Sequence, residues 1–471
     1  MAHAFPDHPF LNGNYGPVRM EAEAPDLEII GDMPTNLTGM LYRNGPNPAY
    51  APRKDYHWFL GDGMIHGFEF NDGKVDYRNK WVRTEKFKVE RQHGEALLST
   101  DFNDLGERDQ RAGNTGLNAA NTSIIYHGDK LLALEEVNPP VELDPDTLET
   151  IGPWHFGGKY SGPMTAHPRV DPKTGEMVFF AYFGGFPGEP KVGLHWVNSA
   201  GALTRSEIID VPYCAMIHDF LITENYIVLP IFPATIDINR ISKGGAFVAW
   251  DPSHHTHVAV IPREGNINGN IRWFEADPCY VYHPLNAYET GDGKIICDMM
   301  QYPDAALFDE NGGNTNALEA TESRLTRWTL DLNANTGDFA QTQLSDFSGD
   351  FPRIDDRVTG LKNDHGFFAT KSLKDQEGGP FDTILHRDFI TGTDHKWVAP
   401  AGQFVAEPVF VPDDADAAEG DGYLLSPVFL KDENRTDLVV LRARDVAAGP
   451  IARAKLPTRV PYGFHGNWRQ F

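Results

Sequence analysis

Turn signals followed by short apolar runs recur along the chain and limit the folds that are open to it. Gly- or Asp-containing turns precede strand-like runs in four segments: NDGKVDY (71–77), HGDKLLAL (127–134), DPKTGEMVFFAY (171–182) and ETGDGKIICDMM (289–300). Segments with a helical period are scarce, and RLTRWTLDL (324–332) alternates, which predicts a strand. Strands at this density favour a sandwich, a barrel or a propeller. A propeller repeats one small unit, so it accommodates 471 residues in a single all-β domain.

Charge and cysteine content exclude several classes of protein. Lys and Arg number 41 against 67 Asp and Glu, a net charge of −26, which argues against a nucleic-acid partner and suits a neutral or apolar ligand. Three cysteines without a CxxC pattern predict no disulfide framework, so a reducing, cytoplasmic location is expected. The N-terminus, MAHAFPDHPFLNG, lacks the pattern of a signal peptide, and no apolar run approaches a membrane span.

Four of the 18 histidines share a local character. Each follows apolar or aromatic residues at an expected strand end or turn: His167, His218, His283 and His465. Separations of 51, 65 and 182 residues keep them off one helix or hairpin, but strands converging on one axis would bring them together. Neutral imidazole suits Fe, Zn, Cu or Ni. Taken singly, each could instead be a half-buried histidine satisfied by a backbone group, and spacing alone does not select these four.

A series of ordered motifs does select them. The segments, which run from LYRNGPNP to the C-terminal region, are LYRNGPNP (41–48), FLGDGMIHGFEF (59–70), NTSIIYHGDKLLALEE (121–136), TAHPRVDPKTGE (165–176), MIHDFLIT (216–223), WFEADPCYVYHPLNAYE (273–289), FPRID (351–355), AEPVFVP (406–412), EGDGYLL (419–425) and FHGNW (464–468). In this order they resemble the carotenoid cleavage oxygenase family from about residue 20 to the end. The resemblance implies an N-terminal extension (1–20) and a single domain (21–471), a seven-bladed β-propeller with a loop and helix cap over one face that carries the active-site tunnel.

The resemblance also implies a metal centre. The family holds Fe(II) on the propeller axis with four histidines, which match His167, His218, His283 and His465. Its carboxylates that orient the imidazoles match Glu136, Asp350 and Glu407, expected to face His218, His283 and His465 respectively. Asp350 departs from the usual Glu, so a backbone shift or a water must make up for one methylene. Asp219, beside His218, is expected to brace its turn rather than to bind metal.

The reaction implied by the family is scission of a C=C bond by O₂, which gives two carbonyl products without an organic cofactor. Thr122 matches a residue that crowds one coordination position, and Phe59 and Leu60 are expected to line the tunnel, although both could be ordinary core. Phenol-cleaving relatives share a Tyr and a Lys that bind the 4-hydroxyl. Here the Lys position is Glu135, and ALLSTDFND (96–104) contains no Tyr. The sequence therefore favours a carotenoid or apocarotenoid substrate, with a stilbenoid or phenylpropene as the alternative.

Other readings stay open at this point. FFAYFGGFPG (179–188) and LPIFPATIDI (229–238) could dock peripherally on a membrane, or could be blade core. The acidic run DDADAAEGDG (413–422) would suit a Ca²⁺-dependent propeller hydrolase, although a surface loop is the simpler interpretation. A non-catalytic binding propeller and an isomerase of retinoid esters are further alternatives. No obligate protein partner is inferred.

Overall fold

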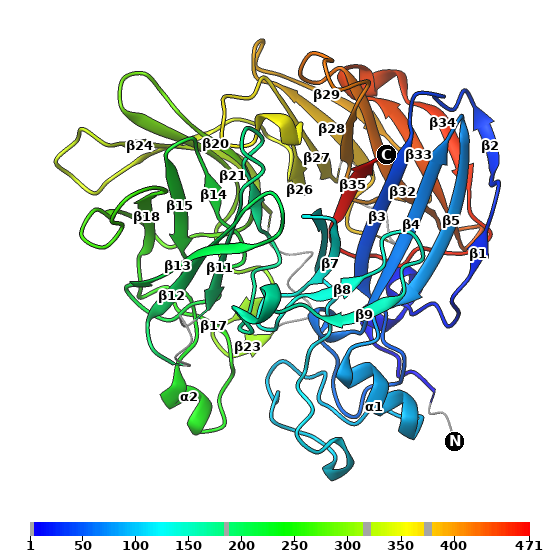
Figure 1. Cartoon of the computed structure of the whole chain (residues 1–471), viewed down its shortest axis with the longest axis horizontal. Coiled ribbons are helices and arrows are strands. Elements are labelled where there is room, and N and C mark those ends of the chain that lie inside the picture. Colours follow the sequence, from blue (N-terminus) through cyan, green and yellow to red (C-terminus); the bar gives the residue numbers. More distant parts are fainter. Residues whose placement is uncertain (1–3, 183–187, 314–321, 372–378) are drawn as a thin grey trace.

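Seven antiparallel sheets form a β-propeller, as the sequence predicts (Figure 1). The computed structural model describes residues 4–182, 188–313, 322–371 and 379–471. We number the sheets as blades 1 to 7 in the order in which their first strands occur after residue 120. Blade 1 contains β6 (Ser123–His127), β7 (Lys130–Leu134), β8 (Val141–Leu143) and β9 (Thr150–Pro153). Blade 2 contains β10 (Arg169–Val170), β11 (Met177–Tyr182), β12 (Lys191–Val197) and β13 (Leu203–Asp210).

Blades 3 to 5 follow the same up-and-down order. Blade 3 contains β14 (Leu221–Ile222), β15 (Tyr226–Ile231), β18 (Thr256–Pro262) and β19 (Arg272–Ala276). Blade 4 contains β20 (Tyr280–Glu289), β21 (Lys294–Tyr302), β24 (Arg324–Asp331) and β25 (Ala340–Gln343), so the alternating segment 324–332 is a strand as predicted. Blade 5 contains β26 (Gly349–Arg353), β27 (His365–Thr370), β28 (Thr383–Asp388) and β29 (Thr393–Val398). Two short hairpins, β16 (Ala234–Thr235) with β17 (Ala249–Trp250) and β22 (Phe308–Asp309) with β23 (Gly312–Gly313), lie outside the blades.

Blades 6 and 7 join the two ends of the chain. Blade 6 contains β30 (Gln403–Val405), β31 (Val409–Pro412), β32 (Gly422–Leu430), β33 (Arg435–Arg442), β34 (Pro450–Lys455) and the N-terminal β2 (Glu28–Gly31). Blade 7 contains the C-terminal β35 (Gly466–Gln470) with β3 (Gly39–Pro46), β4 (Gly63–Asn71), β5 (Lys74–Trp81) and β1 (Glu23–Ala24). Figure 1 shows the blue N-terminal strands lying beside the red C-terminal ones. Hydrogen-bonded pairing in both blades closes the ring, so the propeller has no free seam between its first and last blades.

Local turn chemistry explains why these strands form hairpins. Asp72 and Gly73 both have positive φ, 48° and 73°, in the two-residue turn that joins β4 to β5. Gly128 and Asp129 repeat the pattern between β6 and β7, with φ of 56° and 60°. Such turns match the natural twist of antiparallel strands and favour Gly and Asp. The turn signals in the sequence therefore mark real hairpins.

Helices are few and lie outside the blades. α1 (Glu85–His93) is capped by Thr84, whose hydroxyl accepts the N–H of Phe87 at 3.1 Å, and ends at Gly94 in the left-handed conformation. α2 is Ile238–Ser242. Short 3-10 turns occur at η1 (Pro9–Leu11), η2 (Gly13–Tyr15), η3 (Trp58–Leu60), η4 (Gln110–Ala112), η5 (Phe156–Gly158), η8 (Asp356–Val358) and η9 (Ala443–Ala448). Phe10 and Leu11 of the N-terminal segment are buried in the largest apolar cluster, so this segment packs on the propeller.

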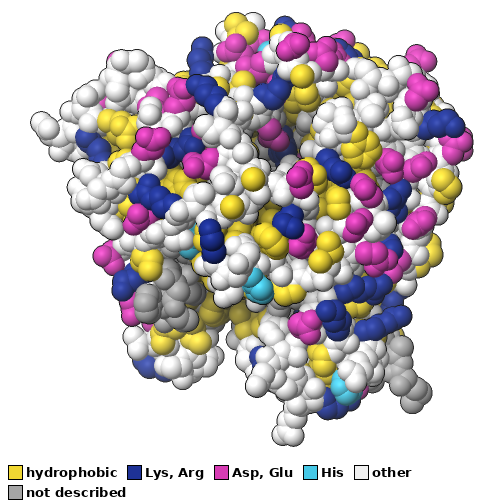
Figure 2. All heavy atoms as spheres, viewed as in Figure 1, with side chains coloured by type: hydrophobic (Ala, Val, Ile, Leu, Met, Phe, Trp, Pro, Cys, Tyr) yellow, Lys and Arg dark blue, Asp and Glu magenta, His cyan; other side chains and the backbone are white. Residues whose placement is uncertain are grey.

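The distribution of charged and apolar side chains on the surface is relevant to the expected membrane contact. Figure 2 shows Lys and Arg side chains interspersed with Asp and Glu, and a hollow between the lobe that carries α1 and the lobe that carries α2. Of the segments considered for membrane docking, residues 179–182 and 229–236 are buried and therefore belong to the blades or their packing; residues 183–187 lie outside the described part. Within the described residues, no helix is long and apolar enough to cross a membrane.

Candidate metal centre and active-site cavity

The inner strands of the seven blades bring one polar side chain each toward the axis. Contacts of β14 with β20, β20 with β26, β31 with β35 and β35 with β6 show that the first strands of adjacent blades pack side by side. Near the start of these strands lie, from blade 1 to blade 7, Thr122, His167, His218, His283, Asp350, Glu407 and His465. Residues far apart in sequence therefore converge because the propeller repeats one position seven times.

The four histidines form a compact group at this point. One ring nitrogen from each of His167, His218, His283 and His465 lies within 4.8 Å of the others. His218 Nε2 is 3.1 Å from both His167 Nε2 and His283 Nε2. The Nε2 atom of His465 is buried and has no hydrogen-bond partner among the described residues. Buried nitrogens without partners are costly unless a ligand satisfies them.

Carboxylates determine which ring nitrogen carries the proton. Nδ1 of His283 lies 2.8 Å from Asp350 Oδ1, and Nδ1 of His465 lies 2.9 Å from Glu407 Oε1. Nδ1 of His218 contacts Glu136 Oε1. A carboxylate accepts a proton, so each of these rings donates from Nδ1 and keeps a lone pair on Nε2. The 3.1 Å separation between the Nε2 atoms of His218 and His283 is therefore not a hydrogen bond, because both atoms carry lone pairs. Together with the nearby ring nitrogens of His167 and His465 they form a donor set that suits a divalent cation.

His167 has a different environment. Its Nδ1 lies 3.5 Å from Asp219 Oδ2, a looser contact than the other three. Asp219 accepts the Phe220 N–H at 2.6 Å and two contacts of 2.7 Å from Arg169. Asp219 thus braces the turn, as expected from the sequence, and it also faces a ring of the cluster, which the sequence did not indicate.

Asp350 reaches His283 directly, without a bridging water. The pairing of β26 with β27 shifts between Asp350 and Arg353, and Phe351 has φ of 56°, in the left-handed region. This conformation is unfavourable for a residue with a side chain. The backbone irregularity directly follows the aspartate. Phe351 also stacks on the His283 ring, with centroids 5.2 Å apart.

Burial and charge shape the ionisation of the cluster. Burial, followed by the neighbouring imidazoles, lowers the pKa of His167 well below its ordinary value. Burial also lowers the pKa of His465, to about 4. Burial disfavours a charged Glu407, but Arg353 and His465 outweigh it and lower the pKa of this carboxyl to about 2. At His283 burial disfavours the charged ring, but Asp350 outweighs it and raises the pKa of that imidazole. Burial thus favours neutral rings at His167 and His465 beside an ionised Glu407.

The cluster lies in the wall of a cavity of about 1220 Å³. Phe59, Leu60, Thr122 and Glu135 all line this cavity, together with Trp58, Phe102, Tyr182, Tyr282, Phe351, Phe381 and Phe464. The N-terminal residues 9–10 and 12–15 also contribute to it, which the sequence did not indicate.

Two polar residues fix the wall between the loop of Phe59 and the cluster. The Thr122 hydroxyl donates to Asn121 Oδ1 at 2.9 Å, while Asn121 Nδ2 donates to the carbonyls of Phe59 and Gly61 at 2.8 and 2.6 Å. The backbone N–H of His465 donates to the Thr122 carbonyl at 3.2 Å. Thr122 therefore connects the cavity wall to the backbone of His465.

The structure accounts for the acidic run that suggested a calcium site. Asp413 pairs with Arg442 at 2.7 Å, and Asp421 pairs with Arg444 at 2.9 Å. Glu419 accepts the N–H groups of Asp364 and His365. The four-histidine group is the candidate metal cluster found among the described residues, and these carboxylates are not part of it.

Comparison with known proteins identifies the family. The model of the family described as retinal pigment epithelial membrane protein matches residues 15–470. An isoeugenol monooxygenase of Pseudomonas nitroreducens is 36% identical over 477 residues, covering 99% of each chain. Carotenoid cleavage oxygenase 1 of Neurospora crassa is 35% identical over 476 residues, covering 96% of this chain and 89% of that one. The crystal structure of a lignostilbene dioxygenase of Pseudomonas brassicacearum matches with a TM-score of 0.94 at 36% identity over 100% of both chains.

The family model covers nearly the whole chain, and the two relatives carry names of oxygenases. These matches confirm the fold and the family predicted from the motifs. They argue against the two alternatives of a Ca²⁺-dependent hydrolase and a non-catalytic binding propeller. The chain belongs to the carotenoid cleavage oxygenase family and is an oxygenase of the alkene-cleaving type.

Proposed function

We propose that the protein is a non-haem Fe(II) oxygenase that cleaves the C=C bond of an aryl alkene, a stilbenoid or a phenylpropene, into two carbonyl products. The observation that carries the proposal is the convergence of four imidazole nitrogens in the wall of an aromatic cavity. His167, His218, His283 and His465 would hold the metal, with Glu136, Asp350 and Glu407 orienting three of the rings. Bound iron supplies the one-electron chemistry that O₂ requires and side chains lack.

The reaction needs no further reactant. Each alkene carbon takes one oxygen atom of O₂ as the C=C bond breaks, so two carbonyl groups form without a reductant. The protein binds the alkene among apolar and aromatic side chains and excludes water from the reacting bond. Phe59, Leu60 and Phe351 provide such surfaces, and Thr122, whose hydroxyl is bonded to Asn121, leaves its methyl group for the cavity.

Two of the three relatives named above, the isoeugenol monooxygenase and the lignostilbene dioxygenase, support an aryl-alkene substrate over the polyene. Glu135 supplies a polar group for such a substrate, in place of the lysine that phenol-cleaving relatives carry. Its Oε2 accepts the Ala119 N–H at 2.9 Å and its Oε1 contacts Asn138, and burial raises the pKa of its carboxyl. A carboxylate has about four lone-pair sites, so Glu135 can also accept a phenolic O–H. A tyrosine that contacts the substrate need not come from residues 96–104, because Tyr15 and Tyr282 also line the cavity.

A carotenoid or apocarotenoid is the second candidate, favoured by one specific observation. The cavity of about 1220 Å³ exceeds the roughly 300–1,000 Å³ that is usual for small-molecule sites. A short phenol would leave much of this space unfilled, whereas a polyene would occupy it. The cytoplasmic location, peripheral membrane contact and the domain boundary at residue 20 remain predictions from the sequence.

The test is a product analysis of the iron-loaded protein in air. Isoeugenol, a 4-hydroxystilbene, the 4-methyl ethers of both and an apocarotenal are incubated separately, and aldehydes are identified by mass spectrometry. We expect phenolic aldehydes, slower turnover of the methyl ethers, and a smaller preference for the free phenols in Glu135→Leu. His218→Ala should abolish all products, while His254→Ala, an exposed histidine outside the cluster, serves as control.

Two results would contradict the proposal in different ways. Shortened apocarotenals without phenolic aldehydes would reject the aryl-alkene substrate and support the polyene on the same site. Equal product yields from His218→Ala and His254→Ala would reject the metal centre itself.

A further inference from the structure

Each carboxylate that faces a metal-binding ring has a second oxygen, and that oxygen is also occupied. Asp350 Oδ2 accepts the hydroxyl of Tyr302 at 2.7 Å while Oδ1 faces His283. Glu136 Oε2 accepts the hydroxyl of Tyr182 at 2.6 Å while Oε1 faces His218. The third carboxylate, Glu407, accepts the backbone N–H of Gly466 at 2.6 Å in the same role.

We propose that Tyr302 and Tyr182 are positioning residues of the metal site, acting on His283 and His218 through the carboxylates of Asp350 and Glu136. The inference rests on the proposed function only for the identity of the metal. A donor on the second oxygen fixes the rotation of the carboxylate about its last bond. It thereby fixes the direction in which the first oxygen receives the imidazole proton, and hence the orientation of the ring.

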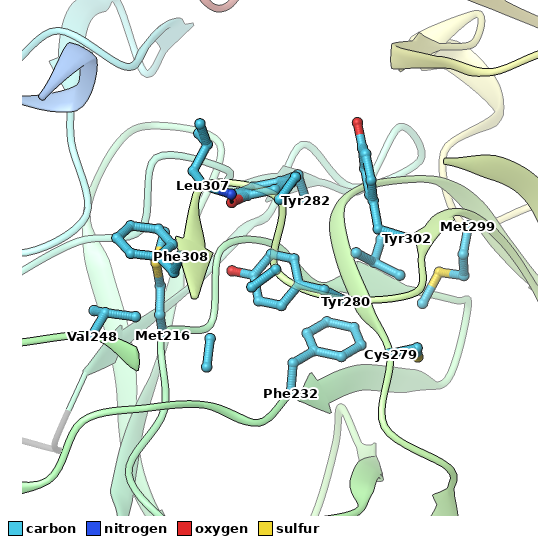
Figure 3. Packing of buried hydrophobic residues seen from close by; sticks show 14 of the residues in the cluster. Met216, Phe232, Val248, Cys279, Tyr280, Tyr282, Met299, Tyr302, Leu307 and Phe308 are labelled. Atoms are coloured by element: carbon cyan, nitrogen blue, oxygen red, sulfur yellow. Dashed lines mark hydrogen bonds between the residues drawn. The ribbon is translucent and has the colours of Figure 1, made fainter. Parts of the chain in front are cut away.

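Tyr302 matters most because Asp350 has the shorter side chain. Tyr302 is the last residue of β21. This strand pairs with β20, which carries His283. Figure 3 shows this hydroxyl pointing away from the apolar side chains of Phe232, Cys279 and Met299. A buried phenol directed out of its apolar surroundings toward a carboxylate forms a strong, charge-assisted hydrogen bond.

Tyr182 anchors the other ring from two sides. Its hydroxyl lies 2.6 Å from Glu136 Oε2 and 2.7 Å from the carbonyl oxygen of Ile217, the residue before His218. The single proton goes to the carboxylate, which is the stronger acceptor. The same phenol therefore contacts both the carboxylate and the backbone that carry His218, so its loss frees the orientation of that ring.

The chain offers a matched control in Tyr280. Tyr280 pairs with Tyr302 across β20 and β21, both are buried, and both are seen in Figure 3. The Tyr280 hydroxyl has no hydrogen-bond partner among the described residues. Replacement of each tyrosine by phenylalanine removes one oxygen and keeps the ring, so the three variants differ in what that oxygen touches.

The experiment measures cobalt(II) binding, which does not depend on turnover. Apo-protein of wild type, Tyr302→Phe, Tyr182→Phe and Tyr280→Phe is titrated with Co(II), and the visible d–d bands report ligand geometry. We expect the affinity of Tyr302→Phe and Tyr182→Phe to fall about tenfold, with altered band positions. Tyr280→Phe should match the wild type in both measurements. Thermal unfolding of each apo-variant checks that the fold is intact.

Wild-type affinity and spectra in Tyr302→Phe and Tyr182→Phe would overturn the proposal, as would an equal loss in Tyr280→Phe. Failure of the proposed function is distinguishable from failure of this inference. If no alkene is cleaved but the cobalt spectra change as expected, the positioning role stands and the substrate assignment fails. If aldehydes form at wild-type rates while the cobalt spectra of the tyrosine variants do not change, the positioning role fails alone.

Discussion

A buried ion cluster holds α1 against the wall of the cavity, and Lys86 lies at its centre. Lys86 Nζ is 2.6 Å from Asp62 Oδ1 and 3.0 Å from Glu90 Oε2, and the three side chains are 4%, 3% and 2% exposed. The attraction of both carboxylates outweighs the effect of burial and raises the pKa of Lys86. Asp62 Oδ2 also accepts the N–H of Ala49, and Glu90 Oε1 accepts those of Leu97 and Leu98. The cluster therefore joins the helix to three loop segments.

We expect Lys86→Met to lower the free energy of unfolding by about 3–5 kcal/mol, because it leaves two buried carboxylates without a cation. Lys88→Met is the matched control on the same helix. Lys88 pairs with Glu85 at 2.8 Å, but the side chains are 53% and 73% exposed, so the loss should stay below about 1 kcal/mol. Urea unfolding, followed by fluorescence and circular dichroism together, measures both values.

A third variant separates charge from packing. Lys86→Met combined with Asp62→Asn and Glu90→Gln removes all three charges and keeps oxygen acceptors for the N–H groups of Ala49, Leu97 and Leu98. Most of the lost stability should return. Phe59 and Leu60 line the cavity, and Asp62 lies two residues after Leu60. Loss of the Lys86 contact should therefore disturb substrate binding, so KM should rise in Lys86→Met more than kcat falls. Equal stability losses in Lys86→Met and Lys88→Met, or no recovery in the triple variant, would refute the reasoning.

Three further predictions concern the metal centre. First, the folded-state pKa of Glu407, about 2, lies below its ordinary 4.5, so its contribution to stability is fully present above about pH 4.5 and is lost as pH falls toward 2. Glu407→Gln should remove about 2 kcal/mol of the stability that apo-protein loses between pH 5 and 3, measured by urea unfolding, whereas Glu28→Gln, at an exposed site, should not. Second, metal at 100 times its Kd should stabilise the wild type by about 2.7 kcal/mol, a rise in Tm that chelator reverses and His218→Ala abolishes; an unchanged Tm on chelation would contradict the metal site. Third, because φ of Phe351 is 56°, Phe351→Gly should be more stable than Phe351→Ala by about 1 kcal/mol in urea unfolding, the reverse of the usual order within strands.

The ordered motifs of the sequence were sufficient to predict the fold and to name the residues that the axis brings together. Local turn chemistry at Asp72–Gly73 and Gly128–Asp129 could be read directly, because a positive φ depends on neighbours in sequence. The four histidines could not be selected by spacing, since each comes from a different blade. Their shared position near the start of an inner strand becomes visible only when the blades are aligned, and the motif resemblance supplied that alignment.

Contacts between blades could not be predicted from the sequence. Nothing in the run that ends β11 indicates that the Tyr182 hydroxyl contacts Glu136, 46 residues earlier. Asp219 was correctly expected to brace its turn, but its position beside His167 depends on how blades 2 and 3 meet. At Asp350 the sequence indicated that a methylene was missing but not that the carboxylate reaches His283 at 2.8 Å, beside a register shift and a left-handed Phe351.

The arrangement of charge around the axis explains why the site suits a neutral substrate and O₂. Four neutral imidazoles would leave a bound divalent ion with its full charge, so compensation must come from farther out. Glu136, Asp350 and Glu407 provide it behind the rings, and their outer oxygens are satisfied by Tyr182, Tyr302 and the Gly466 N–H. Glu407 also lies 3.5 Å from Arg353, which limits the excess of negative charge. Phe59, Leu60 and Phe351 line the cavity with apolar side chains, in the same lining as the rings of His218, His283 and His465. An ionised group that left water for these apolar surfaces would lose its hydration, whereas an alkene and O₂ would lose little, so this part of the cavity favours uncharged reactants.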